Sequence, residues 1–302
     1  MKERVGFIGA GMMGHGMARN ILDKGYSLHV LGHRNRAPVE DLTARGAAEA
    51  ATASELGADC DIVILCVGNS RQVEDLVLGP HGVASRARPS LTVVDATTGD
   101  PNTTRRIAAV LAQRGIDFAD APVTKAPRDA EAGRLNSLVG ASDPVFERIE
   151  PILKCYSETV TRFGEVGAGQ TAKLVNNFIT CGYTALIAEG LSVCAAAGVD
   201  MRKLFAVMST GAADSGVMRK LVPAFLDGDL TGHAFAIGNA RKDVSYFKSL
   251  VDGLGFRSIM ISALLETYDE ALRLDLGDRL MASLFEMHER RNEIDIVPEK
   301  PD

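Results

Sequence analysis

The first half of the chain alternates short apolar runs rich in β-branched residues with segments of helical periodicity. This alternation is typical of parallel βαβ units, which right-handed crossovers join into one twisted sheet with helices on both faces. We therefore predict a doubly wound α/β domain of the Rossmann type. The expected strands are residues 5–9, 28–31, 62–67, 92–96, 118–121, 137–140 and 159–163, and the expected helices are residues 12–23, 71–77 and 102–114.

The pattern changes after the glycine-containing segment 164–167. Residues 170–197 are apolar, Ala-rich and free of proline, which predicts one long, mostly buried helix. Nothing strand-like follows, so the second half is predicted to be all-α. Further helical patterns cover residues 201–208, 218–225, 240–254, 259–274 and 279–291.

These patterns divide the chain into a Rossmann domain (1–165), an all-helical domain (166–292) and a polar tail (293–302), which we expect to be mobile. The long helix is more apolar on all sides than a lone bundle of this size requires. We therefore expect a homodimer, or a dimer of dimers, in which the C-terminal halves pack together.

Composition narrows the class of protein. A chain of 302 residues, 46% hydrophobic and 24% charged, suggests two globular domains. Its net charge of -6 provides no general attraction to nucleic acid or to an anionic membrane. The apolar stretch 5–10 is too short for a signal peptide, and we expect no run of the ~18–20 apolar residues that spans a bilayer, so the predicted location is cytoplasmic. The five cysteines form no C-x-x-C pair and the six histidines fall in no ligand spacing, so we predict buried structural thiols and no metal site.

A G-x-G-x-x-G motif lies between the first expected strand and the first helix. Gly9 would allow the tight turn, Gly11 a close approach of the pyrophosphate, and Gly14 close helix–strand packing. The helix N-terminus would then present N–H groups to the phosphates. Glycine-rich turns are common, so it is the strand–turn–helix context that favours cofactor binding over a purely structural turn. The predicted cofactor-binding residues here are Gly9, Ala10, Gly11, Met12, Met13 and Gly14.

The end of the second expected strand indicates which nicotinamide cofactor is bound. An NAD-binding unit carries an Asp or Glu there, which accepts hydrogen bonds from the ribose hydroxyls. Here the turn 32–36 is basic and no acid occurs before Glu40, which favours NADP(H) over NAD(H) because arginine grips phosphate through paired donors. The alternative is a solvated basic turn. The residues predicted to bind the 2′-phosphate are His33, Arg34, Asn35 and Arg36.

Four blocks of the sequence occur in a fixed order, at residues 7–14 with 17–20, 120–123 with 133–135, 167–169 followed by 173–177, and 242–243. In their residues and their order they resemble those of the β-hydroxyacid dehydrogenase family. The family includes 3-hydroxyisobutyrate, tartronate semialdehyde and 3-sulfolactaldehyde enzymes and is related to 6-phosphogluconate dehydrogenase. The resemblance covers residues 4 to about 290. It implies that a hydride is exchanged between the nicotinamide and the carbinol carbon of a small hydroxy acid, with Lys173 handling the hydroxyl proton.

The residue pattern supports the role of Lys173 separately. Polar residues recur at intervals of three and four on the otherwise apolar long helix, so they share one face. Such a face lines water or a ligand, and burial there would disfavour the charged lysine and so assist proton transfer. The alternative is an ordinary surface lysine on an interdomain helix. The polar positions are Gln170, Lys173, Asn176, Asn177 and Thr180.

The resemblance implies roles for further residues. Asn177 is expected to hydrogen-bond the substrate with Asn176 beside it, and Lys242 to lie over the nicotinamide. Four residues at the ends of two central strands are expected at the cofactor, because an open α/β sheet binds its ligands at the strand carboxyl ends. These are Val67, Gly68, Thr97 and Thr98.

The substrate loop departs from the family. Where the family has Ser-Gly-Gly, this chain has Thr124-Lys125-Ala126, so a hydroxyl is kept but both glycines are lost, and a left-handed backbone there would be costly. Lys125 adds a cation, which resembles the sulfolactaldehyde reductase branch and suggests a substrate with a sulfonate, a phosphate or a second carboxylate. The alternative is that Lys125 points to solvent and pairs with Asp129 or Glu131.

We therefore expect an NADP-dependent β-hydroxyacid dehydrogenase or reductase whose ligands are the cofactor and a small anionic substrate. Residues 1–165 would form its NADP-binding domain, and residues 166–292 its substrate and dimerisation domain. Two alternatives stay open. An imine reductase shares this architecture, but those enzymes tend to replace the lysine found here as Lys173. A catalytically silent NADPH-binding protein would share the cofactor motif. The sequence identifies neither the substrate nor the physiological direction.

Overall fold

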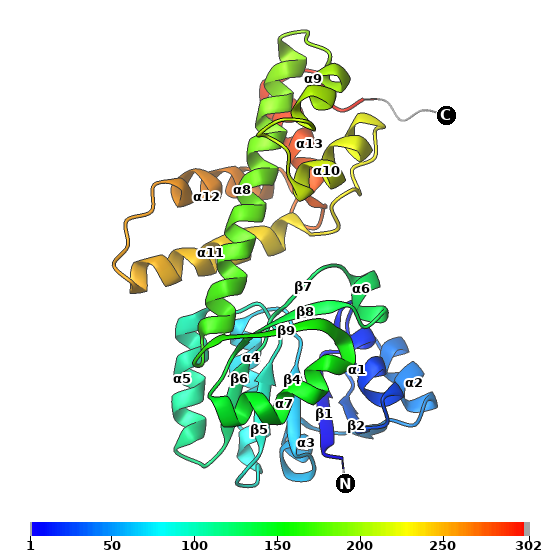
Figure 1. Cartoon of the computed structure of the whole chain (residues 1–302), viewed down its shortest axis with the longest axis vertical. Coiled ribbons are helices and arrows are strands. Elements are labelled where there is room, and N and C mark those ends of the chain that lie inside the picture. Colours follow the sequence, from blue (N-terminus) through cyan, green and yellow to red (C-terminus); the bar gives the residue numbers. More distant parts are fainter. Residues whose placement is uncertain (1, 299–302) are drawn as a thin grey trace. The chain divides into compact units, whose positions relative to one another are not determined.

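In the computed structural model, which describes residues 2–298, the chain forms two compact units, Met1–Lys173 and Leu174–Asp302 (Figure 1). The division falls within α8 (Ala168–Ala196), the long helix predicted from the sequence. It lies a few residues beyond the change in composition near residue 165, because the first turns of α8 pack with the first unit.

The described part of the first unit is built on a nine-stranded sheet. Its order is β3-β2-β1-β4-β5-β6-β8-β7, with β9 paired to β8, and the six strands from β3 to β6 are parallel, as in a dinucleotide-binding fold. The strand β8 runs antiparallel to β6 and β7. The strands are β1 Arg4–Ile8, β2 Ser27–Leu31, β3 Ala48–Ala50, β4 Ile62–Leu65, β5 Thr92–Asp95, β6 Asp117–Asp120, β7 Val123–Thr124, β8 Leu135–Gly140 and β9 Ser157–Gly164.

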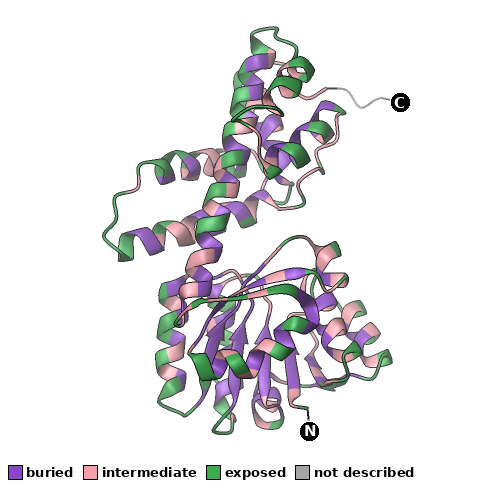
Figure 2. Cartoon of the chain, viewed as in Figure 1, coloured by how far each residue is buried: buried purple, intermediate pink, exposed green. Residues whose placement is uncertain are grey.

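Helices cover both faces of this sheet and create two apolar cores. On one face Phe7, Met17 and Tyr156 are fully buried together, and on the other Leu56, Leu65 and Leu111 are. The central strands β4 and β5 are buried along their whole length, as Figure 2 shows in purple, which explains the unbroken apolar sequence of β4. The helices are α1 Gly14–Asp23, α2 Ala37–Ala44, α3 Ala53–Asp59, α4 Ser70–Leu78, α5 Pro101–Ala112, α6 Pro127–Glu131 and α7 Asp143–Tyr156, with a 3₁₀ turn at Val83–Ser85.

The doubly wound α/β prediction is confirmed, and all seven predicted strands are present. The sequence pattern missed β3, β7, α2, α3, α6 and α7. Both missed strands are three residues or shorter, so neither offers an alternation long enough to detect. The helix α7 carries Pro151 in its interior, a residue that removes a backbone donor and obscures the helical pattern.

The second unit is helical, as predicted, and no β-strand occurs among its described residues. Its core contains stacked Phe225 and Phe285, whose ring centroids are 3.5 Å apart, and the hydroxyl of Tyr268, which donates to the carbonyl of Cys181 at 2.9 Å. The helix predicted over 279–291 begins later, after a 3₁₀ turn at Met281–Ser283. The remaining helices are α9 Met201–Met208, α10 Gly216–Leu226, α11 Ile237–Gly253, α12 Met260–Arg273 and α13 Leu284–Asn292.

The prediction of a mobile tail is wrong for residues 293–298. Ile296 is buried in the helical core, and the N–H groups of Ile296 and Val297 donate to Oε1 of Glu289. Residues 294, 296 and 297 are apolar and pack against the core of the second unit. Residues 299–302 lie outside the described part.

The long helix α8 also departs from expectation. It is long and apolar enough to cross a membrane by length and composition, with a mean hydropathy of 1.5, contrary to the expectation that no run would be. Only 39% of that apolar window is buried within this chain, so the prediction of a mostly buried helix is wrong for a single protomer. The core helix of a soluble protein passes the same test of length and composition, but such a helix is mostly buried. Contacts within this chain leave many positions of α8 exposed, shown green in Figure 2.

Candidate functional site

The loop between β1 and α1 has the geometry of a dinucleotide-binding turn. Gly9 has φ +97°, and a Cβ there would lie 2.2 Å from the Cys66 carbonyl oxygen. A Cβ on Gly14 would lie 2.0 Å from the Gly9 carbonyl oxygen, so the turn closes tightly on itself. At Gly11, by contrast, nothing lies within 4 Å of where a Cβ would be, and the adjacent Met12 is 81% exposed. The loop therefore leaves open space where a pyrophosphate would approach the backbone, and it fits the cofactor.

The predicted strand-end residues do meet at the carboxyl ends of β4 and β5. The Thr97 hydroxyl accepts a hydrogen bond from the Val67 N–H at 3.0 Å and so ties the two strand ends together. The Gly68 N–H donates to the side chain of Gln72. Thr97 is buried and Thr98 half-buried. The Thr97 hydroxyl therefore has a structural role, because it links the ends of two strands. Contact of these residues with the cofactor stays a prediction.

The basic turn after β2 is exposed at His33, Arg34, Asn35 and Arg36. The guanidinium of Arg36 is engaged by Glu49 of β3, with Nη1–Oε1 at 2.6 Å and Nη2–Oε2 at 2.8 Å. This arginine holds the pKa of the Glu49 carboxyl below its usual range. The turn itself contains no acid before Glu40, but the neighbouring strand β3 brings one to it in space. Sequence reasoning missed Glu49 since β3 itself was not predicted.

The start of α8 is held by a buried carboxylate that the sequence reading did not single out. The N–H groups of Gly167 and Gln170 each donate to one oxygen of Asp120, both at 2.6 Å. Gln170 is itself fully buried, and its amide donates to the Thr97 carbonyl and accepts from the Gly99 N–H. These bonds fix the first turn of α8, from which Lys173 projects. The only sequence signal for this role was the position of Asp120 at the end of an apolar strand.

Burial raises the pKa of Asp120 to about 6, and the two backbone N–H groups oppose that rise. A carboxyl whose pKa is higher in the folded than in the unfolded chain stabilises the fold fully below its unfolded pKa and loses that contribution as the pH rises through the folded pKa.

We therefore expect the free energy of unfolding of the parent to fall by up to about 2 kcal/mol more than that of Asp120→Asn between pH 4 and pH 6. Urea unfolding at half-unit pH intervals measures the difference between the two proteins. Taking this difference cancels the titration of the surface carboxylates, which both proteins share. Parallel curves for parent and variant would contradict the assignment.

The proton-transfer candidate Lys173 lies on α8 and is 9% exposed. Gln170, three residues before it, and Asn177, four residues after it, are also buried, as the predicted polar face requires. Asn176 is exposed and Thr180 half-buried, so the buried polar face is narrower than predicted. Lys173 is not an exposed surface lysine.

In the second unit, Asn177 is oriented by a buried carboxylate. Its Nδ2 donates to Oδ2 of Asp243 at 2.6 Å, and its Oδ1 accepts from the Asn176 amide at 3.0 Å. Asp243 is 3% exposed, and its other oxygen lies 3.3 Å from Nζ of Lys242. Lys242 is therefore ion-paired, and its predicted contact with the nicotinamide stays a prediction. Asp243 was missed as a site residue, although an acid in the buried stripe of α11 was a signal for it.

The substrate loop adopts a conformation usually reserved for glycine. Lys125 has φ +84°, so the left-handed backbone is kept although the family's glycines are lost. Its Nζ donates to the Arg134 carbonyl at 2.6 Å and forms an ion pair with Glu158. The sequence alternative of a pair with Asp129 or Glu131 is wrong, since Lys125 reaches across to β9. The Thr124 hydroxyl accepts from the Asn136 amide at 3.2 Å, and Ala126 begins α6 as its N-cap.

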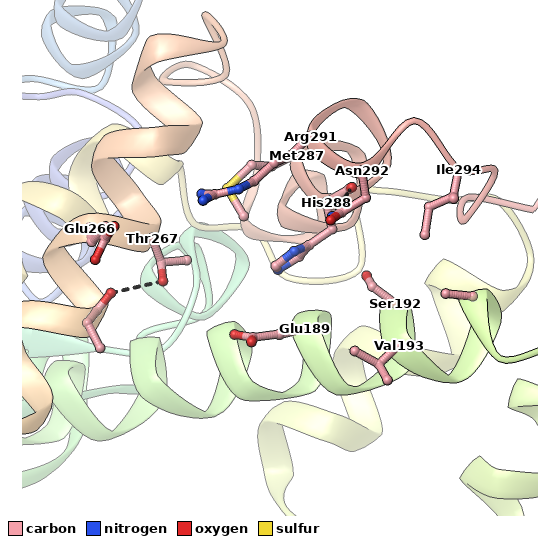
Figure 3. A pocket seen from close by; sticks show the side chains of 12 residues that line it. Glu189, Ser192, Val193, Glu266, Thr267, Met287, His288, Arg291, Asn292 and Ile294 are labelled. Carbon is pink, nitrogen blue, oxygen red and sulfur yellow. Dashed lines mark hydrogen bonds between the residues drawn. The ribbon is translucent and has the colours of Figure 1, made fainter.

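The second unit also holds a pocket of about 610 Å³ between α8, α12 and α13, which Figure 3 shows from close by. Its ionisable lining includes Glu189, Glu266, His288 and Arg291. Burial lowers the pKa of His288. No residue predicted from the sequence as catalytic, cofactor-binding or substrate-binding lines this pocket.

Comparisons with known proteins agree with this geometry. Residues 4–164 match the family model described as the NAD binding domain of 6-phosphogluconate dehydrogenase, and residues 167–287 match that described as the NAD-binding of NADP-dependent 3-hydroxyisobutyrate dehydrogenase. The two matches meet where the sequence composition changes.

Individual relatives are named as dehydrogenases of hydroxy acids or as similar to them. The chain is 33% identical to 2-(hydroxymethyl)glutarate dehydrogenase of Eubacterium barkeri over 242 residues, which are 80% of each chain. It is 34% identical to the probable 3-hydroxyisobutyrate dehydrogenase-like 3 of Arabidopsis thaliana, over 78% of this chain and 73% of that one. The crystal structure of 3-hydroxyisobutyrate dehydrogenase from Salmonella typhimurium is similar with a TM-score of 0.82 and 26% identity, over 95% of this chain and 100% of that one.

Both halves of the chain thus match models of one group of enzymes. The same chain has the strand order of a dinucleotide-binding fold, a glycine turn open to a pyrophosphate, and a lysine near the start of α8. The two family models and the relatives named above do not distinguish the sulfolactaldehyde branch within that group. The chain belongs to the β-hydroxyacid dehydrogenase family and is an NAD(P)-dependent oxidoreductase of the 3-hydroxyacid dehydrogenase type.

Proposed function

We propose that this protein transfers a hydride between NADP(H) and a small β-hydroxy acid or the corresponding acidic aldehyde, with Lys173 as the general acid and base. The observation that carries the proposal is the burial of Lys173 between Gln170 and Asn177 on α8. A buried lysine on a polar helix face is costly unless it serves a ligand or a fixed partner, and titratable groups of this kind are the usual proton-transfer residues.

The nicotinamide, when bound, supplies or accepts the hydride. Lys173 donates a proton to the aldehyde oxygen as the alcohol forms, and accepts it from the hydroxyl in the reverse direction. Asn177 lies one turn further along the same helix, and its amide is held by Asp243 and Asn176. Its second N–H is thus oriented in advance to donate to a substrate oxygen, which lowers the cost of positioning the reactants.

The preference for NADP(H) rests on the turn after β2. Gly32 provides no side chain to accept from a ribose hydroxyl, while Arg34 and Arg36 are exposed on the turn. A guanidinium binds phosphate through paired, charge-assisted hydrogen bonds. The match of residues 167–287 to a model described as NADP-dependent supports the same choice.

For the substrate we propose a small acid with a single anionic group. The cation that distinguished the loop, Lys125, is already paired with Glu158 and bonded to the Arg134 carbonyl. Because that carboxylate offsets the charge of Lys125, a second acid group on the substrate would gain little from it.

The experiment that tests the function is a substrate panel assayed with NADPH and with NADP. We expect turnover of aldehydes or hydroxy acids that carry one carboxylate, such as 3-hydroxyisobutyrate, and weaker activity on a dianionic hydroxy acid with two carboxylates, such as 2-(hydroxymethyl)glutarate. A cyclic imine belongs in the panel. Turnover of the imine alone would indicate an imine reductase, and NADPH binding without turnover of any compound would indicate a catalytically silent binding protein.

We further propose that a second copy of the chain covers the exposed face of α8. Five large apolar side chains on this helix are exposed by 42–64%, at spacings of four, four, three and seven residues. Such spacing forms one continuous seam of the kind that pairs helices. A two-fold axis on the helix would bury the seam against itself. The residues are Val175, Ile179, Tyr183, Leu186 and Val193.

Leu186→Glu is expected to convert the dimer to a monomer, because it places a charge in the middle of an apolar seam. Light scattering coupled to size-exclusion chromatography measures the mass against the 32.1 kDa of one chain. Val207→Glu on α9 is the matched control, since Val207 is also exposed, by 69%, but lies outside the seam. A parent that is monomeric, or a control that dissociates equally, would contradict this assignment.

A further inference from the structure

An ion pair covers Gly32, the residue that follows β2. A Cβ built on Gly32 would lie 2.1 Å from Nη1 of Arg36 and 2.5 Å from Oε1 of Glu49. The pair therefore occupies the volume that a side chain at position 32 would fill. Any larger residue at this position would have to displace both groups.

That volume has a defined role in dinucleotide-binding folds. The acid at the end of the second strand accepts a hydrogen bond from the ribose 2′-hydroxyl of NAD, and the same place receives the 2′-phosphate of NADP. In this chain the acid is missing from β2, but β3 runs parallel beside it, with Glu49 in register with Val30. Glu49 thus brings a carboxylate to the place that the family's acid would reach from its own strand.

The pair is weak enough to open. Both side chains are substantially exposed, Arg36 by 47% and Glu49 by 36%, and exposed ion pairs contribute little to stability. A 2′-phosphate carries more charge than a carboxylate and would form the same paired hydrogen bonds with the guanidinium. Phosphate and Glu49 repel each other and compete for one partner, whereas a ribose hydroxyl competes with neither.

We propose that Glu49 is a specificity-determining residue that restrains the preference for NADP(H). With NAD(H) bound, its carboxylate accepts a hydrogen bond from the ribose 2′-hydroxyl while Arg36 stays paired. With NADP(H) bound, the 2′-phosphate takes Arg36 from Glu49. The inference rests on the proposed binding of the adenosine ribose at this turn.

The test compares dissociation constants of NADPH and NADH for the parent, Glu49→Gln and Glu40→Gln, measured by the change in fluorescence of the reduced nicotinamide on binding or by calorimetry, since the chain contains no tryptophan. Glutamine keeps the size of Glu49 but removes its charge. We expect Glu49→Gln to bind NADPH roughly three- to tenfold more tightly and NADH about threefold more weakly. Glu40 is exposed on α2 and its charge also acts on Arg36, but it forms no hydrogen bond with it among the described residues, so Glu40→Gln controls for net charge.

In a protein that already carries Arg36→Ala, Glu49→Gln should increase NADPH affinity by less than it does in the parent, because no guanidinium remains to be released from Glu49. Weaker NADPH binding by Glu49→Gln would overturn the proposal and make Glu49 a residue that orients Arg36 for phosphate. If Glu49→Gln changed the dissociation constants of both cofactors equally, or no more than Glu40→Gln does, the proposal would also be overturned. The pair of Arg36 and Glu49 would then be a surface contact without a role in cofactor choice. The cofactor preference of the parent, measured first, tests the proposed NADP(H) dependence independently of these outcomes.

Discussion

Lys173→Ala is expected to lower turnover by about 100- to 10,000-fold, the range for removal of a general acid or base. The dissociation constant of NADPH should change by no more than a few-fold. The lysine side chain is buried on α8, and a methyl group in its place leaves the proton without a donor of suitable acidity at the reacting oxygen. Steady-state turnover at saturating substrate, together with NADPH titration, separates the two effects.

Two further variants keep this prediction specific. Lys173→Met preserves most of the buried volume and should lose as much activity as the alanine variant, so a packing defect would show as a difference between them. Lys248→Ala removes an exposed lysine that pairs with Asp252 and should retain parental turnover. Turnover of Lys173→Ala within tenfold of the parent would remove Lys173 from the chemistry.

The second large effect is expected at the turn after β2. Replacing Arg34 and Arg36 together by alanine should weaken NADPH binding by at least ~2 kcal/mol, or about 30-fold, while NADH binding stays nearly unchanged. Only NADPH carries the phosphate that both guanidinium groups would bind. Titrations of both cofactors at one ionic strength measure the difference, since salt screens exposed charges.

Arg106→Ala is the control for loss of an exposed arginine, because Arg106 forms a comparable ion pair with Glu74 away from this turn. A parent enzyme that already prefers NADH, or a double variant that loses both cofactors equally, would show that the turn does not bind the 2′-phosphate. If Arg34→Ala alone weakened NADPH binding and Arg36→Ala alone did not, Arg36 would remain paired with Glu49 when NADPH is bound.

The features that the sequence determined by itself depend on residues that lie close together along the chain. The alternation of apolar runs predicted the order of strands and helices, since the period of side-chain direction is a local property of the backbone. The G-x-G-x-x-G turn was readable because its three glycines are close in sequence, and their close contacts at Gly9 and Gly14 confirm it. The spacing along a single helix also placed Lys173 on a polar face, but it left open whether the lysine is buried or exposed, and the folded chain shows that it is buried.

Only the tertiary structure decided which partner each polar group has. Asp120 caps α8 from 47 and 50 residues away, Asp243 orients Asn177 from 66 residues away, and Glu158 reaches Lys125 from 33 residues away. Glu49 meets Arg36 because two strands lie in register, although β3 is too short to be recognised as a strand. A sequence shows that a charged residue is present, but its partner depends on strand register and helix packing, which are set by contacts between distant segments. The roles of the individual charges at this candidate site therefore became visible only in the folded chain.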